Sequence, residues 1–182
     1  MKLCMAQINT LVGDIGGNTQ RVLEVSAAQK AAGAQLVVFP ELTLTGYPPE
    51  DLLLRGDLLD RTEAALARLC AELPPDLAVV VGYPRGQDGV LFNSAGVISA
   101  GKLLAQYDKQ CLPNYEVFDE KRYFGAGTES CLVDIDGLSV GLTICEDIWH
   151  PEPAAQAKVA GAEILININA SPFHRGKSLE RL

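Results

Sequence analysis

Basic residues are scarce in this chain of 182 residues. It has 15 Lys and Arg against 23 Asp and Glu, which gives a formal net charge of −8 at pH 7. A nucleic-acid-binding surface needs clustered Lys and Arg to contact phosphates, and a polybasic membrane patch needs them to contact anionic lipids. The composition therefore predicts neither nucleic acid nor a membrane surface as a partner.

Long hydrophobic runs are absent as well, although 48% of the residues are hydrophobic. No uninterrupted apolar stretch reaches the length of a membrane-spanning helix. The first residues, "MKLCMAQINT", begin a strand-like run without the basic and apolar regions of a signal peptide. We therefore expect an unprocessed cytoplasmic protein with one sizeable core.

Histidine and paired cysteines are also in short supply. The only two histidines are His150 and His174, and the five cysteines stand at positions 4, 70, 111, 131 and 145. An odd number of cysteines without a C-x-x-C pair fits neither a disulfide framework nor a zinc site. The sequence thus predicts free thiols in a reducing compartment and no metal site.

A recognisable ATP-binding motif is missing too. The glycine-rich stretch "VGDIGGN" at residues 12–18 lacks the G-K-[ST] ending of a phosphate-binding loop. We interpret its glycines as turn residues. No bound cofactor is therefore expected in these residues.

What the chain does contain is an alternation of apolar β-branched runs with helical patterns, which is typical of an α/β layered fold with some antiparallel pairs. Strands are predicted over 2–9, 35–39, 77–83 and 163–170, and hairpins around Gly101 and Asp136-Gly137. Helices are predicted from a cap at Asn18 or Thr19 to about Ala32, over 57–72, and over 151–160. Without linkers or repeats, residues 1–182 read as one domain whose pattern stops midway.

Three reactive side chains directly follow predicted strands. Glu41 follows "QLVVFP", Lys109 follows "KLLAQYD" and Cys145 follows "LSVGLTI". In open α/β sheets, sites form beyond the carboxyl ends of the strands, so strands lying side by side would bring the three into one crevice. Each residue alone is more often a buried thiol or a solvated loop charge. Together they indicate a catalytic site, because reactive groups cluster there.

This trio suits acyl transfer. Cys145 is the candidate nucleophile, at a strand-to-turn position like a nucleophile elbow, although the G-x-S-x-G pattern is absent. Glu41 is the candidate general base and then acid, and Lys109 the candidate stabiliser of an oxyanion. A competing thiol–imidazole dyad would use His150 or His174. His150, just before a proline, is better explained as the residue that precedes a helix.

Two carboxylates follow the candidate nucleophile in "LTICEDIW", at Glu146 and Asp147. Negative neighbours disfavour a thiolate. We therefore expect Cys145 to rest as a thiol and to lose its proton to Glu41 only during attack.

Four segments belong together: "FPELTLTGYPPEDLL", "YDKQCLPNYEVFDEKRYF", "GLTICEDIW" and "NASPFHRGK". As an ordered set they resemble the nitrilase (carbon–nitrogen hydrolase) superfamily, most closely the N-terminal glutaminase domains of glutamine-dependent NAD+ synthetases. The resemblance covers nearly the whole chain and places the family's Glu–Lys–Cys triad on Glu41, Lys109 and Cys145. It implies a nitrilase-like α-β-β-α sandwich with mixed sheets, and such sandwiches usually form homo-oligomers.

The resemblance also implies a reaction, the hydrolysis of L-glutamine to glutamate through a cysteinyl thioester. The ammonia would pass to a covalently joined synthetase domain, which uses ATP and Mg2+ to amidate deamido-NAD+. Neither that domain nor the later strands of the family's fold are in these 182 residues, so we expect a domain that is incomplete at its C-terminus. Two alternatives are a stand-alone amidase or N-carbamoyl hydrolase of the same superfamily, and a non-catalytic module that binds a partner.

The resemblance further suggests contacts with glutamine. Glu146 would pair with the α-ammonium group, and Tyr115 would help to close the pocket. Ser171 would contact the substrate or cap the turn before a proline, and Trp149 would wall the pocket or pack in the core. The remaining suggestions are Glu120 as a weak, exposed partner of Lys109, and either Arg175 or Lys177 for the α-carboxylate.

Overall fold

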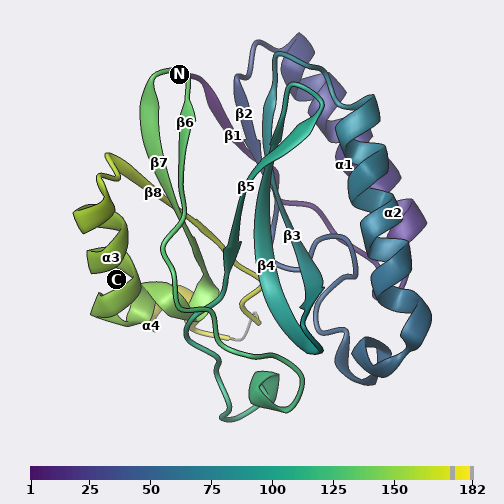
Figure 1. The fold of residues 1–182 in the computed structure, drawn as a ribbon, viewed down its shortest axis with the longest axis vertical. Coiled ribbons are helices and arrows are strands. Elements are labelled where there is room, and N and C mark those ends of the chain that lie inside the picture. The colour runs from purple at the N-terminus through teal and green to yellow at the C-terminus, as the bar shows by residue number, and fades with distance from the viewer. Residues whose placement is uncertain (173–174, 181–182) are drawn as a thin grey trace.

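Two mixed β-sheets face each other in this computed structural model, which describes residues 1–172 and 175–180 (Figure 1). The first sheet has five strands in the order β1-β2-β3-β4-β5. They are β1 (Leu3–Met5), β2 (Leu36–Val38), β3 (Ala78–Gln87), β4 (Val90–Ser99) and β5 (Lys102–Asp108). The strands β1 to β3 are parallel, and β3 to β5 are antiparallel.

The second sheet has three strands in the order β6-β7-β8. They are β6 (Leu132–Ile135), β7 (Leu138–Ile144) and β8 (Ile164–Ile168). The strand β6 is antiparallel to β7, and β7 is parallel to β8. The β6–β7 hairpin turns at Asp136 and Gly137 as predicted, and both residues have positive φ, as tight hairpin turns require.

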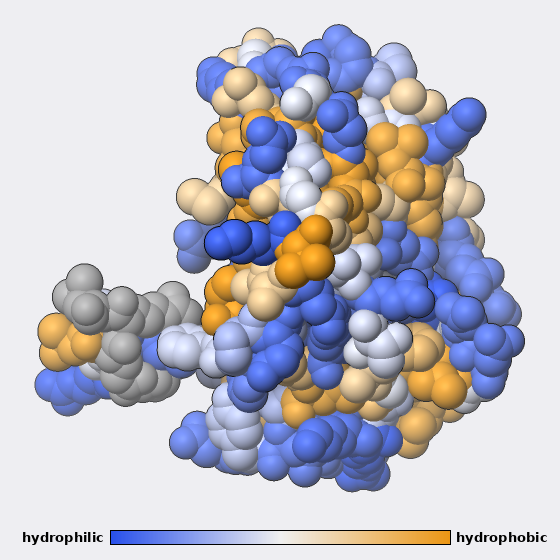
Figure 2. All heavy atoms as spheres, turned by 60° about the vertical axis from the view of Figure 1, so that its left-hand side comes forward, coloured by the Kyte–Doolittle hydropathy of each residue, from blue (hydrophilic) through white to orange (hydrophobic). Residues whose placement is uncertain are grey.

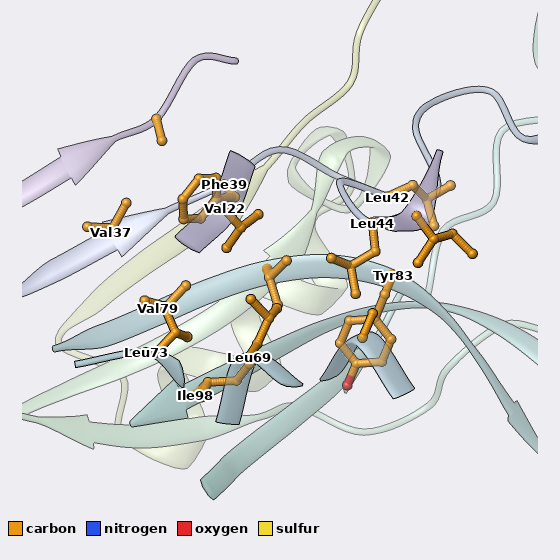
Figure 3. Packing of buried hydrophobic residues seen from close by; sticks show 14 of the residues in the cluster. Val22, Val37, Phe39, Leu42, Leu44, Leu69, Leu73, Val79, Tyr83 and Ile98 are labelled. Carbon is orange, nitrogen blue, oxygen red and sulfur yellow. The ribbon is translucent and has the colours of Figure 1, made fainter. Parts of the chain in front are cut away.

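Helices cover the outer faces of the two sheets (Figure 1). The helices are α1 (Ile15–Ala31), α2 (Gly56–Glu72), α3 (Pro151–Ala160) and α4 (Lys177–Glu180), with short 3-10 turns η1 (Glu50–Leu54), η2 (Glu120–Arg122) and η3 (Cys145–Trp149). Apolar side chains of α1 and α2 pack on the first sheet (Figure 3), whereas α3 approaches β7 closely at Gly141. A second core fills the space between the sheets. The layers are therefore α-β-β-α, as the family resemblance implied.

Strand β2 shows why its sequence is almost entirely apolar. Leu36 faces the core between the sheets, and Val37 faces the core under the helices. Both side chains are fully buried, as expected for a strand covered on both faces. Strand β8 differs from β2, although its sequence is also mostly apolar. It lies at the edge of its sheet, and its residues are partly buried and partly half-buried.

The start of α1 differs from the prediction as well. Asp14 is its N-cap and accepts a hydrogen bond from the backbone N–H of Gly17 at 3.0 Å. Asn18 instead bonds the loop backbone at Leu11 and Leu44. A Cβ on residue 17 would lie 2.2 Å from Asp14 Oδ2, so a larger residue there would displace the cap carboxylate, and this glycine lies inside the helix rather than in a turn.

Strand β1 ends earlier than predicted, at Met5 instead of residue 9. Within the described residues, no helix is both long and apolar enough to cross a membrane.

Candidate active site

Glu41 reaches the site by crossing over a neighbouring strand. After β2 the chain passes over β3 at Gly82, where an added Cβ would lie 2.4 Å from the backbone nitrogen of Leu42 and 2.7 Å from the carbonyl oxygen of Pro40. The next residues then follow β3, and Leu44 donates its N–H to the carbonyl of Gly82 at 3.1 Å. This crossing carries Glu41 past β3 to Lys109, at the end of β5, although β2 and β5 are separated by two strands. The expectation of adjacent strand ends was therefore wrong, but the residues do meet.

Lys109 is fixed through its backbone and its side chain. Its N–H donates to the carbonyl of Asn93 in β4 at 2.8 Å. Its Nζ donates to Glu41 Oε1 at 2.8 Å and to both carboxylate oxygens of Glu120 at 2.8 and 2.9 Å. The side chain of Lys109 is fully buried. A buried ammonium group is tolerated because charge-assisted hydrogen bonds replace its water.

Glu120 is the residue whose role the sequence underestimated. It is only 5% exposed, so its pair with Lys109 is a buried contact and not the weak surface pair that was predicted. Tyr47 donates a third hydrogen bond to Glu120 at 3.1 Å. Burial raises the pKa of Glu120, and the Lys109 ammonium opposes the rise. Burial alone would lower the pKa of Lys109, but Glu41 and Glu120 together raise it above its ordinary value. Lys109 therefore stays protonated.

Cys145 occupies an elbow between β7 and η3. Its φ is +47°, in the left-handed region that a residue other than glycine adopts at an energetic cost. This geometry matches the predicted strand-to-turn nucleophile position. The thiol lies 3.7 Å from the hydroxyl of Ser171, and the next N–H before that serine, from Ala170, donates to Glu41 Oε2 at 3.0 Å. The segment after β8 therefore links the nucleophile to the candidate base.

Asp147 holds this elbow in place, a role that the sequence analysis did not assign. It is fully buried and accepts hydrogen bonds from the hydroxyl of Tyr107 and from three backbone N–H groups, those of Gln110, Cys111 and Ile144, at 2.7 to 3.1 Å. These donors belong to the end of β7 before the elbow, to β5 and to the segment after Lys109. One carboxylate thus ties the nucleophile's turn to the lysine's strand. The signal in the sequence that could have indicated this role was an acidic residue shortly after the end of a buried strand.

The electrostatics of Cys145 agree with a resting thiol. Its pKa is raised from 9.0 to about 12, first by burial and then by the charge of Glu41 and a hydrogen bond to it. Lys109 and Ser171 act in the opposite direction. This direction agrees with the prediction. The largest causes that disfavour the thiolate are burial and Glu41, and not the neighbouring Glu146 and Asp147.

The residues predicted to contact glutamine lie in two groups. Tyr115 and Glu146 contact each other, whereas Ser171 lies beside the thiol of Cys145. Tyr115 donates to Glu146 Oε2 at 2.9 Å, and His150 Nε2 lies 3.6 Å from Glu146 Oε1. His150 caps α3, as expected, and it contacts Glu146, so the dyad hypothesis gains no support from it. Trp149 is 67% exposed and does not pack in the core.

The two candidates for the α-carboxylate, Arg175 and Lys177, lie near the end of the described chain. Lys177 begins α4, and none of the described contacts of the triad involves it. Arg175 is exposed. His174 lies outside the described residues. Over 1–172 and 175–180, no group of three or more His, Cys, Asp or Glu side chains could hold a metal ion.

Two hollows are lined by Glu41 or by the residues that directly follow Lys109 and Cys145 in the chain. One, of about 590 Å³, is lined by Cys111, Tyr115 and Glu146, among others. The other, of about 630 Å³, is lined by Glu41, Ser171 and the edges of β1 and β8. Each volume falls in the range of pockets for small molecules. The arrangement as a whole provides a neutral nucleophile, a carboxylate beside it and a fixed cation, which is what acyl transfer from an amide requires.

Comparisons with known proteins agree with this geometry. The chain is 45% identical over its whole length to a glutamine-dependent NAD(+) synthetase of Xanthomonas campestris, of which it covers 33%. It superposes on the glutamine-dependent NAD+ synthetase of Acinetobacter baumannii with a TM-score of 0.93 and 38% identity, over 98% of this chain and 34% of that one. An amidase from Nesterenkonia gives a TM-score of 0.86 at 26% identity, over 98% and 68% of the two chains.

The chain thus spans about a third of the length of the curated relatives it matches. Residues 2–181 match the carbon-nitrogen hydrolase family. Fold, site and sequence agree, and the chain belongs to the carbon–nitrogen hydrolase family.

Proposed function

We propose that this chain is the glutamine amidohydrolase part of a glutamine-dependent NAD+ synthetase. The observation that carries the proposal is the buried cluster of Glu41, Lys109 and Glu120 beside the thiol of Cys145. The named relatives support the choice of glutamine, because those at 45% and 41% identity are glutamine-dependent NAD(+) synthetases.

Acylation begins with a neutral thiol. Cys145 Sγ attacks the carboxamide carbon of glutamine while Glu41 takes the thiol proton, so no free thiolate has to form in the buried site. The developing oxyanion needs a cationic donor. Lys109 provides it, because one N–H can serve both oxygens of Glu120 and leaves another for the substrate. The C–N bond then breaks, Glu41 returns the proton to the leaving nitrogen, and ammonia departs.

Deacylation uses the same groups in the same roles, with water in place of the thiol as the nucleophile. Water attacks the thioester carbon while Glu41 takes a proton from it, and Lys109 again balances the oxyanion. The C–S bond breaks, the thiol is protonated by Glu41, and glutamate leaves. Glu41 alternates between base and acid, so its ion pair with the Lys109 ammonium group affects every proton transfer.

Recognition of a free amino acid would come from Glu146. Its side chain is only 14% exposed, and Tyr115 orients it through Oε2. Such a carboxylate favours a substrate with an α-ammonium group over a simple aliphatic amide. We place Ser171 beside the thiol of Cys145, Trp149 at the edge of the substrate site, and Lys177 among the groups that would attract the α-carboxylate.

A stand-alone amidase is the second candidate, favoured by the structural likeness to the Nesterenkonia amidase. The test measures ammonia release from L-glutamine, asparagine, aliphatic amides and N-carbamoyl amino acids, with Cys145→Ala as the inactive control. We expect glutamine to be preferred. Turnover of aliphatic amides without glutamine would favour the amidase, and a protein that hydrolyses none of these would be a binding module.

The remaining parts of the proposal concern the surroundings of the domain. Ammonia would be used by a synthetase domain with ATP and Mg2+, and this chain itself would need no cofactor or metal.

Free cysteines suit a reducing cytoplasm. A homo-oligomer is supported by exposed apolar residues on η3 and α3, namely Ile148, Trp149 and Val159. Figure 2 shows hydrophobic side chains reaching the surface on the side toward the second sheet.

A further inference from the structure

Asn93 contacts both charged partners of the candidate site. It lies in β4, and its side chain is completely buried. Its Nδ2 donates to Glu41 Oε1 at 2.8 Å, and its backbone carbonyl accepts the N–H of Lys109 at 2.8 Å. One residue of the central sheet therefore fixes the side chain of the base and the backbone of the lysine.

The orientation of this amide is determined by its partner. An ionised carboxylate only accepts hydrogen bonds, so the nitrogen and not the oxygen of Asn93 must face Glu41. The amide oxygen Oδ1 then has no partner among the described groups, although it is buried. An unpaired buried acceptor is unusual in a folded protein. The hydrogen bond that the Asn93 side chain makes is therefore the one from its nitrogen to Glu41.

The donors are distributed unevenly over the two oxygens of Glu41. Among the backbone and amide or ammonium donors of the described residues, Asn93 and Lys109 donate to Oε1, whereas the N–H of Ala170 donates to Oε2. Two strong donors on one oxygen draw charge to it and fix the plane of the carboxylate. The less occupied oxygen keeps a lone pair for a further proton. It also faces the segment that carries Ser171, the residue in contact with the thiol of Cys145.

We propose that Asn93 is a positioning residue that holds Glu41 so that Oε2 takes the proton of Cys145. This inference rests on the proposed function, because it assigns a role within the same reaction. Without the amide, the carboxylate can turn until both oxygens pair with Lys109, and the oxygen that should act as base is then neutralised. A neutral donor is needed at this position, since a cation would weaken the base and an anion would repel it.

Two variants of similar size to asparagine remove the donor. Asn93→Leu replaces the amide by a branched apolar side chain, and Asn93→Asp places a second carboxylate beside Glu41. We expect kcat for ammonia release in the intact protein to fall about 30-fold or more in both, with KM changed less than about twofold. Ser26→Ala is the control. Ser26 lies in α1, and its hydroxyl, like the amide oxygen of Asn93, is buried and without a partner among the described groups, so this variant should keep full activity.

A double-mutant comparison separates positioning from a structural role. Asn93→Leu should cause no further loss in a Glu41→Gln background, because the amide acts only through that carboxylate. Melting curves identify whether Asn93→Leu or Asn93→Asp has failed to fold. If one has, the kinetics of the other variant test the role of Asn93.

The outcomes are distinguishable from a failure of the proposed function. Unchanged kcat in folded Asn93→Leu, or an equal loss in the Glu41→Gln background, would overturn the role of Asn93. If the unaltered protein hydrolyses aliphatic amides and not glutamine, the substrate is wrong and the variants are compared on that amide. If it hydrolyses neither, both proposals fail.

Discussion

Replacing Glu41 by glutamine separates the two effects that this residue has on Cys145. At rest, the carboxylate raises the pKa of the thiol by its charge and by a hydrogen bond, in addition to burial. During turnover, it takes the thiol proton. A glutamine amide has nearly the same shape but neither property. We predict that Glu41→Gln makes the thiol easier to ionise and the enzyme nearly inactive.

The magnitude follows from the pKa of Cys145, which stands at about 12 instead of 9.0. A rise of this size lowers the thiolate fraction at neutral pH about a thousandfold, or about 4 kcal/mol. Thiolates of higher pKa are better nucleophiles, and a Brønsted slope of about 0.45 recovers about twentyfold of that loss. A small neutral thiol reagent should therefore modify Cys145 about fiftyfold more slowly than an ordinary exposed thiol.

In Glu41→Gln the pKa of Cys145 should fall by about one unit or more, because burial still raises it but Lys109 now acts without an opposing charge. Turnover should fall by about a hundredfold to ten-thousandfold, the usual contribution of a general base. The thiolate form should then be more abundant at neutral pH in the variant that is less active.

The assay is an ultraviolet titration of thiolate, taken as the difference between each protein and its Cys145→Ala counterpart so that the other thiols and the tyrosines cancel. Ammonia release gives kcat for the same samples. The exposed Glu63 on α2 provides a control of equal charge, and Glu63→Gln should change neither quantity. If Cys145 in Glu41→Gln titrates at or above its value in the unaltered protein, or if turnover persists, the reasoning is refuted.

Four further predictions use the same framework. Glu120→Gln should lower kcat about tenfold or more with little change in KM, since the lysine loses a buried partner; steady-state kinetics decide. Asp147→Asn should lower the free energy of unfolding by about 2–4 kcal/mol in urea, because an amide cannot accept all four hydrogen bonds. Gly82→Ala should cost about 1–3 kcal/mol and reduce activity, whereas Gly16→Ala, where a Cβ meets nothing, should gain about 0.5–1 kcal/mol. Glu146→Gln should raise KM for glutamine about tenfold and leave kcat nearly unchanged, and the reverse pattern would contradict its role in binding.

Local patterns were sufficient for most of the secondary structure. The apolar run before Glu41, the Asp136-Gly137 turn and the proline that begins α3 each report on a conformation decided within a few neighbouring residues. The start of α1 was missed because both Asp14 and Asn18 are residue types that cap helices. The hydrogen bond of Asn18 to Leu44, a tertiary contact, draws Asn18 into the loop and leaves Asp14 as the cap.

The position of each triad residue behind a strand was visible in the sequence, but the route by which they meet was not. Strand order is a long-range property, and β2 and β5 are not neighbours. Their residues come together because the chain crosses β3 at a glycine, a close approach that no local pattern encodes.

The sequence by itself determined the identity of the reactive groups and their order along the chain, because side-chain chemistry and local backbone preference are carried by the residues themselves. Only the tertiary structure decided their states. Burial made Glu120 a partner of Lys109 rather than a surface charge, set the pKa of Cys145, and turned Asp147 into the anchor of the elbow. Desolvation and hydrogen bonding depend on what surrounds a group in space, and for this site those surroundings come from segments more than one hundred residues apart.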